Sequence, residues 1–247
     1  MKAKHRYFVL VAAAAALVNN NRPVEGFATT LGTASVTGVV RLEGTPPKPT
    51  PVNMAKEPSC AKMHATAPMT EDIVANANGT LQNVVVYVSE GLPDMPPNTA
   101  AETATFNQKD CTYLPHVLAV QANQKITVIN SDKTSHNIHP LPAYNREWNK
   151  SQPPGVPAFQ ETFSREEIAI PVKCNVHPWM KAYIAVFRHP YFSVSNQDGS
   201  FSVKNLPPGN YTISAWQEKL GTVTQKVTVA AGEAKTLDFA FKIRAGR

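Results

Sequence analysis

The chain is short of charge, cysteine and long apolar runs, and each shortage excludes a class of protein. Charged residues make up 17% of its 247 residues, against about 25% in ordinary soluble domains. A disordered tail protein combines high charge with low hydrophobicity, whereas 43% of these residues are hydrophobic. Three cysteines are too few for a disulfide-built scaffold, and the odd number leaves one thiol to explain. The length therefore predicts one or two folded domains.

Several motifs that carry chemistry are also missing from the sequence. It contains no HExxH, GxSxG or P-loop pattern, which would indicate a metalloprotease, a serine hydrolase or a phosphate-binding loop. It has no cluster of Lys and Arg of the kind that binds nucleic acid. We therefore expect neither peptidase chemistry nor a nucleic-acid partner.

Residues 1–28 are typical of a secretory signal peptide. Three cations, Lys2, Lys4 and Arg6, precede the apolar run Phe8–Val18, which is shorter than the ~20 residues that a membrane-spanning helix needs. An uncleaved anchor is the alternative. Removing this segment takes away four cations and one anion, so the net charge falls from +6 to +3. We expect export to the periplasm or the cell exterior, where disulfides form, with no membrane span after cleavage.

The rest of the chain is rich in proline and in segments of period two. With 21 prolines, helices should be few. The alternating segments, separated by Gly, Pro, Asn and Asp, are 34–42, 83–88, 114–120, 125–130, 182–187, 200–203, 211–216, 223–229 and 236–243. Two Pro-rich stretches, 45–80 and 141–160, lack this pattern. The sequence therefore predicts an all-β protein of the sandwich type.

The most informative segment is Cys-Asn-Val-His-Pro-Trp-Met at 174–180. Pro178 disfavours a helix here, so a tight loop after a strand is expected to gather Cys174, His177 and Met180 around one point. Thiolate, imidazole and thioether are soft donors that suit copper, and a second imidazole completes the donor set of a blue-copper site. Ser-His-Asn-Ile-His at 135–139 offers it, with His136 and His139 as the candidates.

These two segments resemble the ligand loops of the cupredoxins, and the Cys-x2-His-x2-Met spacing is most similar to amicyanin. The resemblance implies a Greek-key sandwich over 104–190 and one type 1 copper ion. It implies His136, which directly precedes Asn, as the fourth ligand beside Cys174, His177 and Met180. It also implies that Asn137 ties the two loops together by hydrogen bonds.

The chain departs from that family in two places, and one surface role follows from the resemblance. Asn175 stands where the family usually has Thr or Ser, at a position that contributes to the bonds between the loops. The stretch 141–160 is longer than its counterpart in amicyanin, so whether it covers the metal is open. In cupredoxins the loop histidine reaches the surface through an apolar patch, which implies an electron exit at His177, Pro178 and Trp179, with Pro140 nearby.

Cys60 and Cys111 lie outside the copper motif. A disulfide between them leaves Cys174 as the single free thiolate and accounts for the odd cysteine; the alternative is two unrelated reduced thiols. His64, in Lys-Met-His at 62–64, is interpreted as a loop residue.

A second resemblance covers the segments on both sides. The turn Asp198-Gly199 and the sequence Leu-Pro-Pro-Gly at 206–209, followed by Tyr211 and Ile213, resemble the carboxypeptidase regulatory-like, transthyretin-type sandwich. Its first strand is similar to 36–40. We therefore expect 33–92 and 193–243 to form such a sandwich with the cupredoxin part inserted, or two consecutive domains as the alternative.

These patterns predict an exported blue copper protein that carries single electrons between protein redox partners and is not itself an enzyme. The first alternative is a periplasmic copper carrier, or a binding or adhesion module without electron transfer. The second is a copper oxidase fragment. It would need a second copper cluster, for which seven histidines are few.

Overall fold

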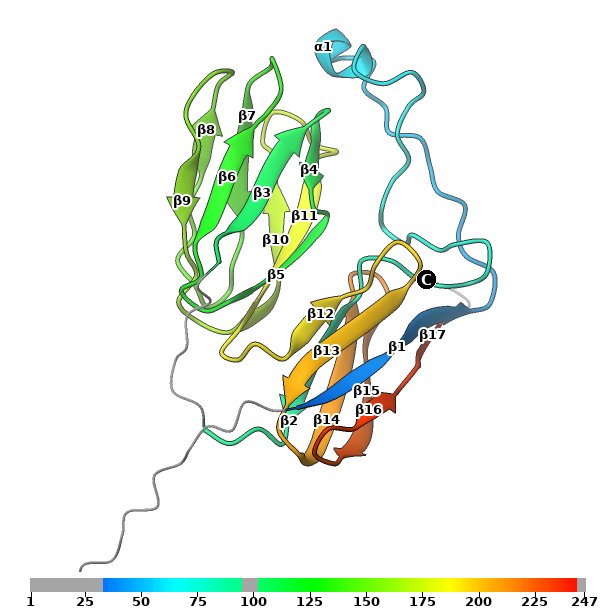
Figure 1. Cartoon of the computed structure of the whole chain (residues 1–247). Helices are drawn as coiled ribbons and strands as arrows, with labels where there is room; N and C mark the ends of the chain where they lie inside the picture. Colours follow the sequence, from blue (N-terminus) through cyan, green and yellow to red (C-terminus); the bar gives the residue numbers. More distant parts are fainter. Residues whose placement is uncertain (1–32, 95–101, 244–247) are drawn as a thin grey trace, which may run out of the picture. The chain divides into compact units, whose positions relative to one another are not determined.

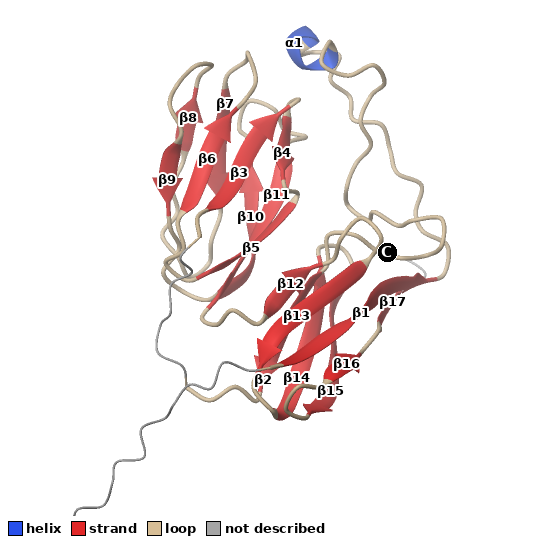
Figure 2. Cartoon of the chain, in the orientation of Figure 1, coloured by secondary structure: helices blue, strands red, loops and turns tan. Residues whose placement is uncertain are grey.

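The computed structural model describes residues 33–94 and 102–243. The signal peptide expected at 1–28 lies outside them. Strands make up almost all the regular structure, and one short helix, α1 (Pro58–Ala61), occurs in the described residues (Figure 2). None of the described helices has the length and apolar character needed to cross a membrane. The all-β expectation is therefore confirmed.

Two four-stranded sheets, drawn from both ends of the described chain, form what we call the terminal sandwich (Figure 1). One sheet has the order β13-β1-β16, with β17 also paired to β1, and the other has the order β12-β2-β14-β15. Their inner faces share one hydrophobic core. The strands are β1 (Ala34–Glu43), β2 (Val85–Glu90), β12 (Phe192–Val194), β13 (Ser200–Leu206), β14 (Gly209–Gln217), β15 (Gly221–Val229), β16 (Ala234–Thr236) and β17 (Phe239–Lys242).

Turn residues set the order of these strands. The Asp198-Gly199 turn leads into β13, and Gly199 takes a φ of +80° at a point where a Cβ would lie 2.6 Å from Thr80 Cβ. The next turn follows Leu206, and the Tyr211 hydroxyl donates back across it to the Pro207 carbonyl at 2.8 Å. Tyr211 and Ile213 both face the core. Among the described strands, β1 and β2 pair only with strands from beyond residue 191.

The intervening strands form the central sandwich, with sheet orders β5-β11-β10-β7-β8 and β4-β3-β6-β9. Buried side chains from both sheets again share one core. The strands are β3 (Ala104–Lys109), β4 (Thr112–Leu114), β5 (Val117–Gln121), β6 (Ile126–Asn130), β7 (His136–Pro140), β8 (Lys150–Gln152), β9 (Phe159–Glu161), β10 (Glu167–Lys173) and β11 (Lys181–Phe187).

Three sequence-based boundaries need correction. The stretch 141–160 is not wholly irregular, because β8 lies within it and β9 begins in it, each pairing with a longer strand. Such three-residue strands are too short to show a period. The segment 236–243 is broken between β16 and β17, where the Asp238 carboxylate accepts the Val39 N–H at 2.8 Å. The segment 114–120 divides between β4 and β5 at a cis Leu114–Pro115 bond.

Candidate metal centre

Two turns of the central sandwich bring the candidate ligands together. His136 opens β7, and Cys174 directly follows β10. Because β7 pairs with β10, with Lys173 opposite His139, the two segments lie side by side. The second turn is closed by its own backbone, since Cys174 N–H donates to the Met180 carbonyl at 3.2 Å. The Cys-to-Met segment is therefore a tight loop after a strand, as the sequence predicted.

Three donor atoms of this group converge. His136 Nδ1 and His177 Nδ1 are 2.9 Å apart, and Cys174 Sγ is 3.9 Å from His177 Nδ1. One ligand atom from each of these residues lies within 4.8 Å of the others. All three side chains are buried, and so is Met180 in the same core. The structure thus gathers the four residues that the sequence singled out at one end of the central sandwich.

His139, the competing candidate, points elsewhere. Its Nε2 lies 2.6 Å from Glu147 Oε1, and its Nδ1 lies 3.2 Å from Asn175 Oδ1. It belongs to no cluster of potential ligands in the described residues. Between the two histidines that the sequence left open, the structure places His136 beside Cys174.

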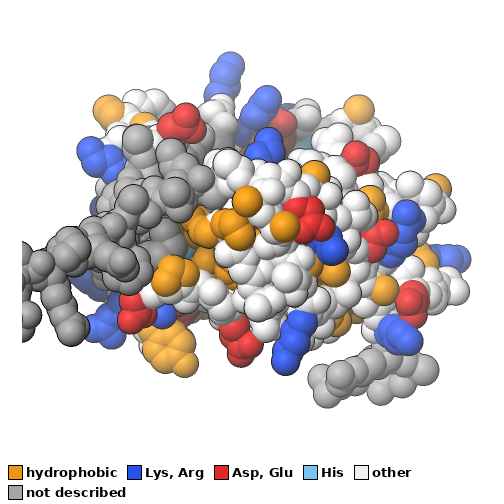
Figure 3. All heavy atoms as spheres, turned by 60° about the horizontal axis from the view of Figure 1, so that its bottom comes forward, with side chains coloured by type: hydrophobic (Ala, Val, Ile, Leu, Met, Phe, Trp, Pro, Cys, Tyr) orange, Lys and Arg blue, Asp and Glu red, His pale blue; other side chains and the backbone are white. Residues whose placement is uncertain are grey.

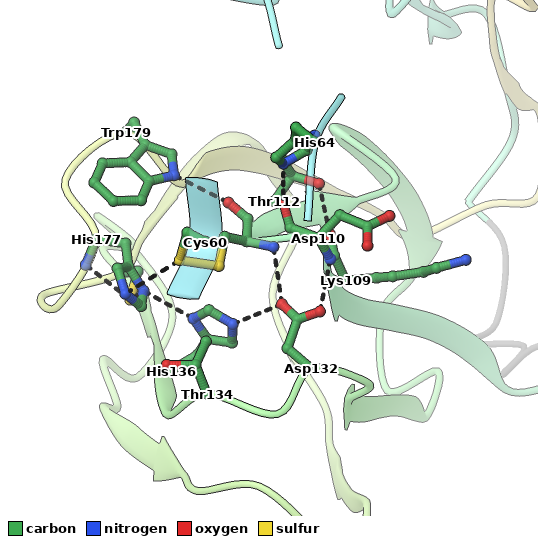
Figure 4. The surroundings of a disulfide bond; sticks show 12 residues. Cys60, His64, Lys109, Asp110, Thr112, Asp132, Thr134, His136, His177 and Trp179 are labelled. Atoms are coloured by element: carbon green, nitrogen blue, oxygen red, sulfur yellow. Dashed lines mark hydrogen bonds and ion pairs between the residues drawn. A yellow bond between two sulfur atoms is a disulfide. The ribbon is translucent and has the colours of Figure 1, made fainter. Parts of the chain in front are cut away.

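Asp132 is the residue at this centre that sequence reasoning missed. Its Oδ2 lies 2.8 Å from His136 Nε2, and the ring's other nitrogen, Nδ1, faces His177 (Figure 4). A carboxylate on the far nitrogen is the usual partner of a metal-binding histidine because it fixes the tautomer. The carboxylate also accepts the backbone N–H groups of Asp110 and Cys111, at 2.7 and 2.8 Å. An acidic residue four positions before the histidine is the signal that could have pointed to it.

Asn137 joins the two turns. Its Oδ1 accepts the Asn175 N–H at 2.7 Å and the Cys174 thiol at 3.4 Å. Its amide nitrogen donates to Asn149 Oδ1 at 2.7 Å. The backbone of Asn175 supplies the bond between the loops, so a Thr or Ser side chain is not needed for it.

Electrostatics at the metal-free centre favour the metal-binding protonation states of Cys174 and His177, and the protonated form of His136. Burial raises the pKa of the Cys174 thiol, but the neighbouring His136 and backbone N–H groups outweigh burial and hold that pKa below its usual value. Burial, together with the positive charge of His136, lowers the pKa of His177. Burial lowers the pKa of His136, yet Cys174 and Asp132 together raise it above its usual value. A thiolate and a neutral imidazole are the ligand forms of cysteine and histidine.

The expected disulfide between Cys60 and Cys111 is present, with the two Cα atoms 5.6 Å apart. Cys174 is the free, buried cysteine. The bond fastens residues 52–69, which we call the cover and which include α1, to the turn between β3 and β4. Cys60 Sγ lies 3.6 Å from His177 Nε2 (Figure 4). The segment that lies over the loop histidine is therefore the cover rather than the stretch 141–160.

The cover changes the expected surface around His177. The histidine is 1% exposed and Pro140 is also buried, so neither reaches solvent as the cupredoxin resemblance implied. The reason is the position of Cys60 on the outer nitrogen of the ring. Of the expected patch, Pro178 is exposed and Trp179 is half-buried. The Trp179 ring centroid is 5.1 Å from that of His177.

The residues present fit a copper ion. Two imidazole nitrogens, one thiolate and a nearby thioether are the donor types of a mononuclear blue-copper centre. The imidazoles turn corresponding nitrogens toward each other and the thiol lies beside both. Hard cations such as Mg²⁺ and Ca²⁺ prefer oxygen ligands, which this group does not offer.

Comparison with known proteins finds relatives of two kinds. A family model, the carboxypeptidase regulatory-like domain, matches residues 178–242. This part of the chain is similar to that domain. The match begins earlier than residue 193, within the turn at 174–180, whereas β11 pairs in the described structure with strands of the central sandwich. The search of curated proteins found no match.

Solved structures similar to this chain include three copper proteins. A purple cupredoxin from Nitrosopumilus maritimus is 21% identical, with a TM-score of 0.29, over 34% of this chain and 98% of its own. A methionine-to-alanine mutant of amicyanin in the Cu(I) form is 19% identical, with a TM-score of 0.30, over 41% and 97%. A copper-containing nitrite reductase from Thermus scotoductus is 18% identical, with a TM-score of 0.32, over 39% of this chain and 25% of the reductase. This chain thus spans a quarter of the reductase.

Proposed function

We propose that the protein is an exported type 1 copper protein that carries single electrons between protein redox partners. The observation that carries the proposal is the convergence of His136 Nδ1, His177 Nδ1 and Cys174 Sγ within 4.8 Å in a buried core. We propose Met180, buried in the same turn, as the weak axial ligand. Bound copper would supply one-electron redox chemistry.

The contribution of this chain is to hold the ligands still. Asp132 fixes the His136 ring, and Asn137 joins the two turns. A donor set that is held in place by bonds on each ligand segment needs little rearrangement when the charge changes, and low rearrangement suits electron transfer. The same arrangement excludes water, since each ligand side chain is at most 2% exposed.

Burial of the proposed ligands supports an electron carrier rather than an enzyme. A catalytic metal keeps an open position for water or substrate, whereas the cover and the core enclose this group. The alternative of a copper carrier requires ready release of the ion, which the cover opposes. We therefore propose outer-sphere electron exchange, with no substrate bound at the metal.

The proposed exit for electrons runs from His177 to Trp179. The two rings lie 5.1 Å apart between centroids, and Trp179 is the more exposed. Trp179→Lys should slow electron self-exchange between oxidised and reduced copies while leaving the visible spectrum unchanged. Val176→Lys is the matched control, because Val176 is 51% exposed in the same turn. Equal self-exchange rates in the two variants would show that the tryptophan is no exit.

Copper binding is tested with residues 29–247. Addition of Cu(II) should give an intense visible band and a type 1 EPR signal, both lost in Cys174→Ser and altered in His136→Ala. His139→Ala is the matched control and should keep both signals, because His139 bonds to Asn175 and Glu147 instead. A colourless, redox-silent wild type overturns the proposal. A coloured protein that gives up copper to a chelator within seconds would instead favour the alternative of a copper carrier.

Compartment, domain limits and partners complete the proposal. A buried disulfide suits the oxidising periplasm or cell exterior.

The strand pairings support a terminal sandwich made of 33–92 and 193–243, with the copper domain at 104–190 inserted. For partners, we propose proteins rather than nucleic acid. On the face in Figure 3, Lys and Arg side chains alternate with Asp and Glu instead of forming one basic patch.

A further inference from the structure

The cover is a loop whose two arms pair with each other at its base. Val52 N–H donates to the Pro68 carbonyl at 2.8 Å, and Thr70 N–H donates to the Thr50 carbonyl at 2.9 Å. Beyond this base the loop carries only α1, four residues long. An isolated helix of that length has no stability of its own in water. The position of the cover therefore depends on what fastens its tip.

Few contacts fasten the tip. Met54 and Cys60 are the buried residues of the cover and join the central core, and the partly buried Val52 and Met63 pack against it. His64 Nε2 lies 2.8 Å from the Asp110 carbonyl oxygen. The disulfide to Cys111 is the one covalent link, and the described residues around Cys60 on both sides are largely exposed.

What the tip covers is the metal-binding turn. Val176 and Pro178 are exposed on either side of His177, so the turn itself lies at the surface. The His177 ring is nevertheless 1% exposed, because Cys60 Sγ sits 3.6 Å from its outer nitrogen. Trp179 is bonded to the other cysteine of the disulfide, because its Nε1–H donates to the Cys111 carbonyl at 3.1 Å (Figure 4). Lifting the tip would expose the ring and open the way to Cys174.

We propose that the Cys60–Cys111 disulfide locks the cover over the metal centre, so that copper enters and leaves while the bond is open and is retained once it closes. The inference rests on the proposed function and adds an order of assembly to it. Closing the bond removes two electrons and two protons from the Cys60 and Cys111 thiols and forms one S–S bond. The disulfide of an oxidising partner protein takes up both electrons and both protons and becomes a dithiol.

The first experiment needs no copper. In the copper-free oxidised protein and in Cys60→Ala/Cys111→Ala alike, Cys174 is the one free thiol, so labelling by a thiol reagent reports access to the centre alone. The double variant should label faster by about tenfold or more, because labelling follows the population of the open state. Val203→Ala, a cavity in the terminal core, is the control for general destabilisation and should label slowly. Equal labelling of wild type and double variant overturns the lock.

A double variant that fails to fold is replaced by the wild-type protein reduced with a phosphine. Circular dichroism establishes that the fold is kept, and mass spectrometry reads the labelling of Cys174 separately from Cys60 and Cys111. Slow labelling of Cys174 in the folded, reduced protein also overturns the lock.

The second experiment uses copper. The oxidised, copper-free protein should take up Cu(II) slowly and the open form quickly, as followed by the visible band, and a chelator should strip the oxidised, copper-loaded protein slowly. Equal uptake and release in both forms overturn the lock while leaving the copper site standing. Failure of both forms to bind copper overturns the proposed function instead, and the labelling result then still decides whether the disulfide holds the cover.

Discussion

The two sandwiches share an architecture and differ in what they bury. The terminal core is built from aliphatic and aromatic side chains, and its described buried members include no cysteine or methionine. The central core buries Cys174 and Met180 among its aliphatic residues, with His136, His177 and Asp132 buried beside them. The strands of both parts serve packing. Four buried polar residues of the central part gather at the two turns that hold the candidate ligands, namely Asp132, His136, Asn137 and His177. The two sandwiches therefore differ most at these turns.

The largest expected effect comes from matched cavities in the two cores. Ile138 and Ile213 are both fully buried, one in each sandwich. Replacing either with alanine should lower the free energy of unfolding by about 2–5 kcal/mol, as measured by urea denaturation. Ile138→Ala should also shift the copper spectrum, because Ile138 lies in β7 between Asn137 and His139, whereas Ile213→Ala should leave it unchanged. The same spectral response in both variants would contradict the division of roles.

The next effect tests the bond between the turns. Asn137→Ala removes the acceptor of the part-buried Asn175 N–H and of the buried Cys174 thiol, and should cost about 1–3 kcal/mol of stability. Asn149→Ala is its control, since it removes only the contact to the Asn137 amide nitrogen, and should cost less. Thermal unfolding of the metal-free proteins measures both. Equal losses would mean that the contact to Asn149 carries the effect.

A similar effect, on the metal rather than the fold, is expected at Asp132. Asp132→Asn weakens the partner of His136 Nε2 and should lower copper affinity by about 10–100-fold. Asp110→Asn makes the same change of charge in the adjoining turn, where Asp110 acts through its backbone groups. Competition with a chelator gives both affinities. An unchanged affinity in Asp132→Asn would remove the carboxylate from the centre.

The smallest effect depends on pH and lies outside the metal centre. Burial raises the pKa of Glu167, but the Asn145 side chain and the N–H groups of 143–145 outweigh it and hold the pKa below 4.5. A pKa depressed by folding contributes stability above the unfolded value and loses it as pH falls through the folded one. Glu167→Gln should therefore cost on the order of 1 kcal/mol at neutral pH. In urea denaturation the difference from wild type should vanish well below pH 4.5; a difference that stays constant through the acid range would contradict this account.

The fold was largely readable from the sequence because its longer strands alternate and its turns carry Gly, Pro, Asn and Asp. The three-residue strands β8, β9 and β12 were missed, since three residues show no period and owe their pairing to neighbours. The longer strands β3 and β10 also fall outside the alternating segments given from the sequence. The candidate ligands could be singled out in the sequence because Cys, His and Met in one turn have few other uses. The role of Asp132 and the burial of His177 were not predicted, because both depend on contacts that form only in the folded chain.

The disulfide also keeps the chain in one piece after a single proteolytic cut within the loop that it closes. Cys60 and Cys111 are 51 residues apart, and β2, a strand of the terminal sandwich, lies between them. The bond closes a covalent ring around that stretch of chain. A protease that cuts once anywhere between residues 61 and 110 leaves both fragments joined, so the product migrates as two pieces on a denaturing gel only after a thiol reductant is added.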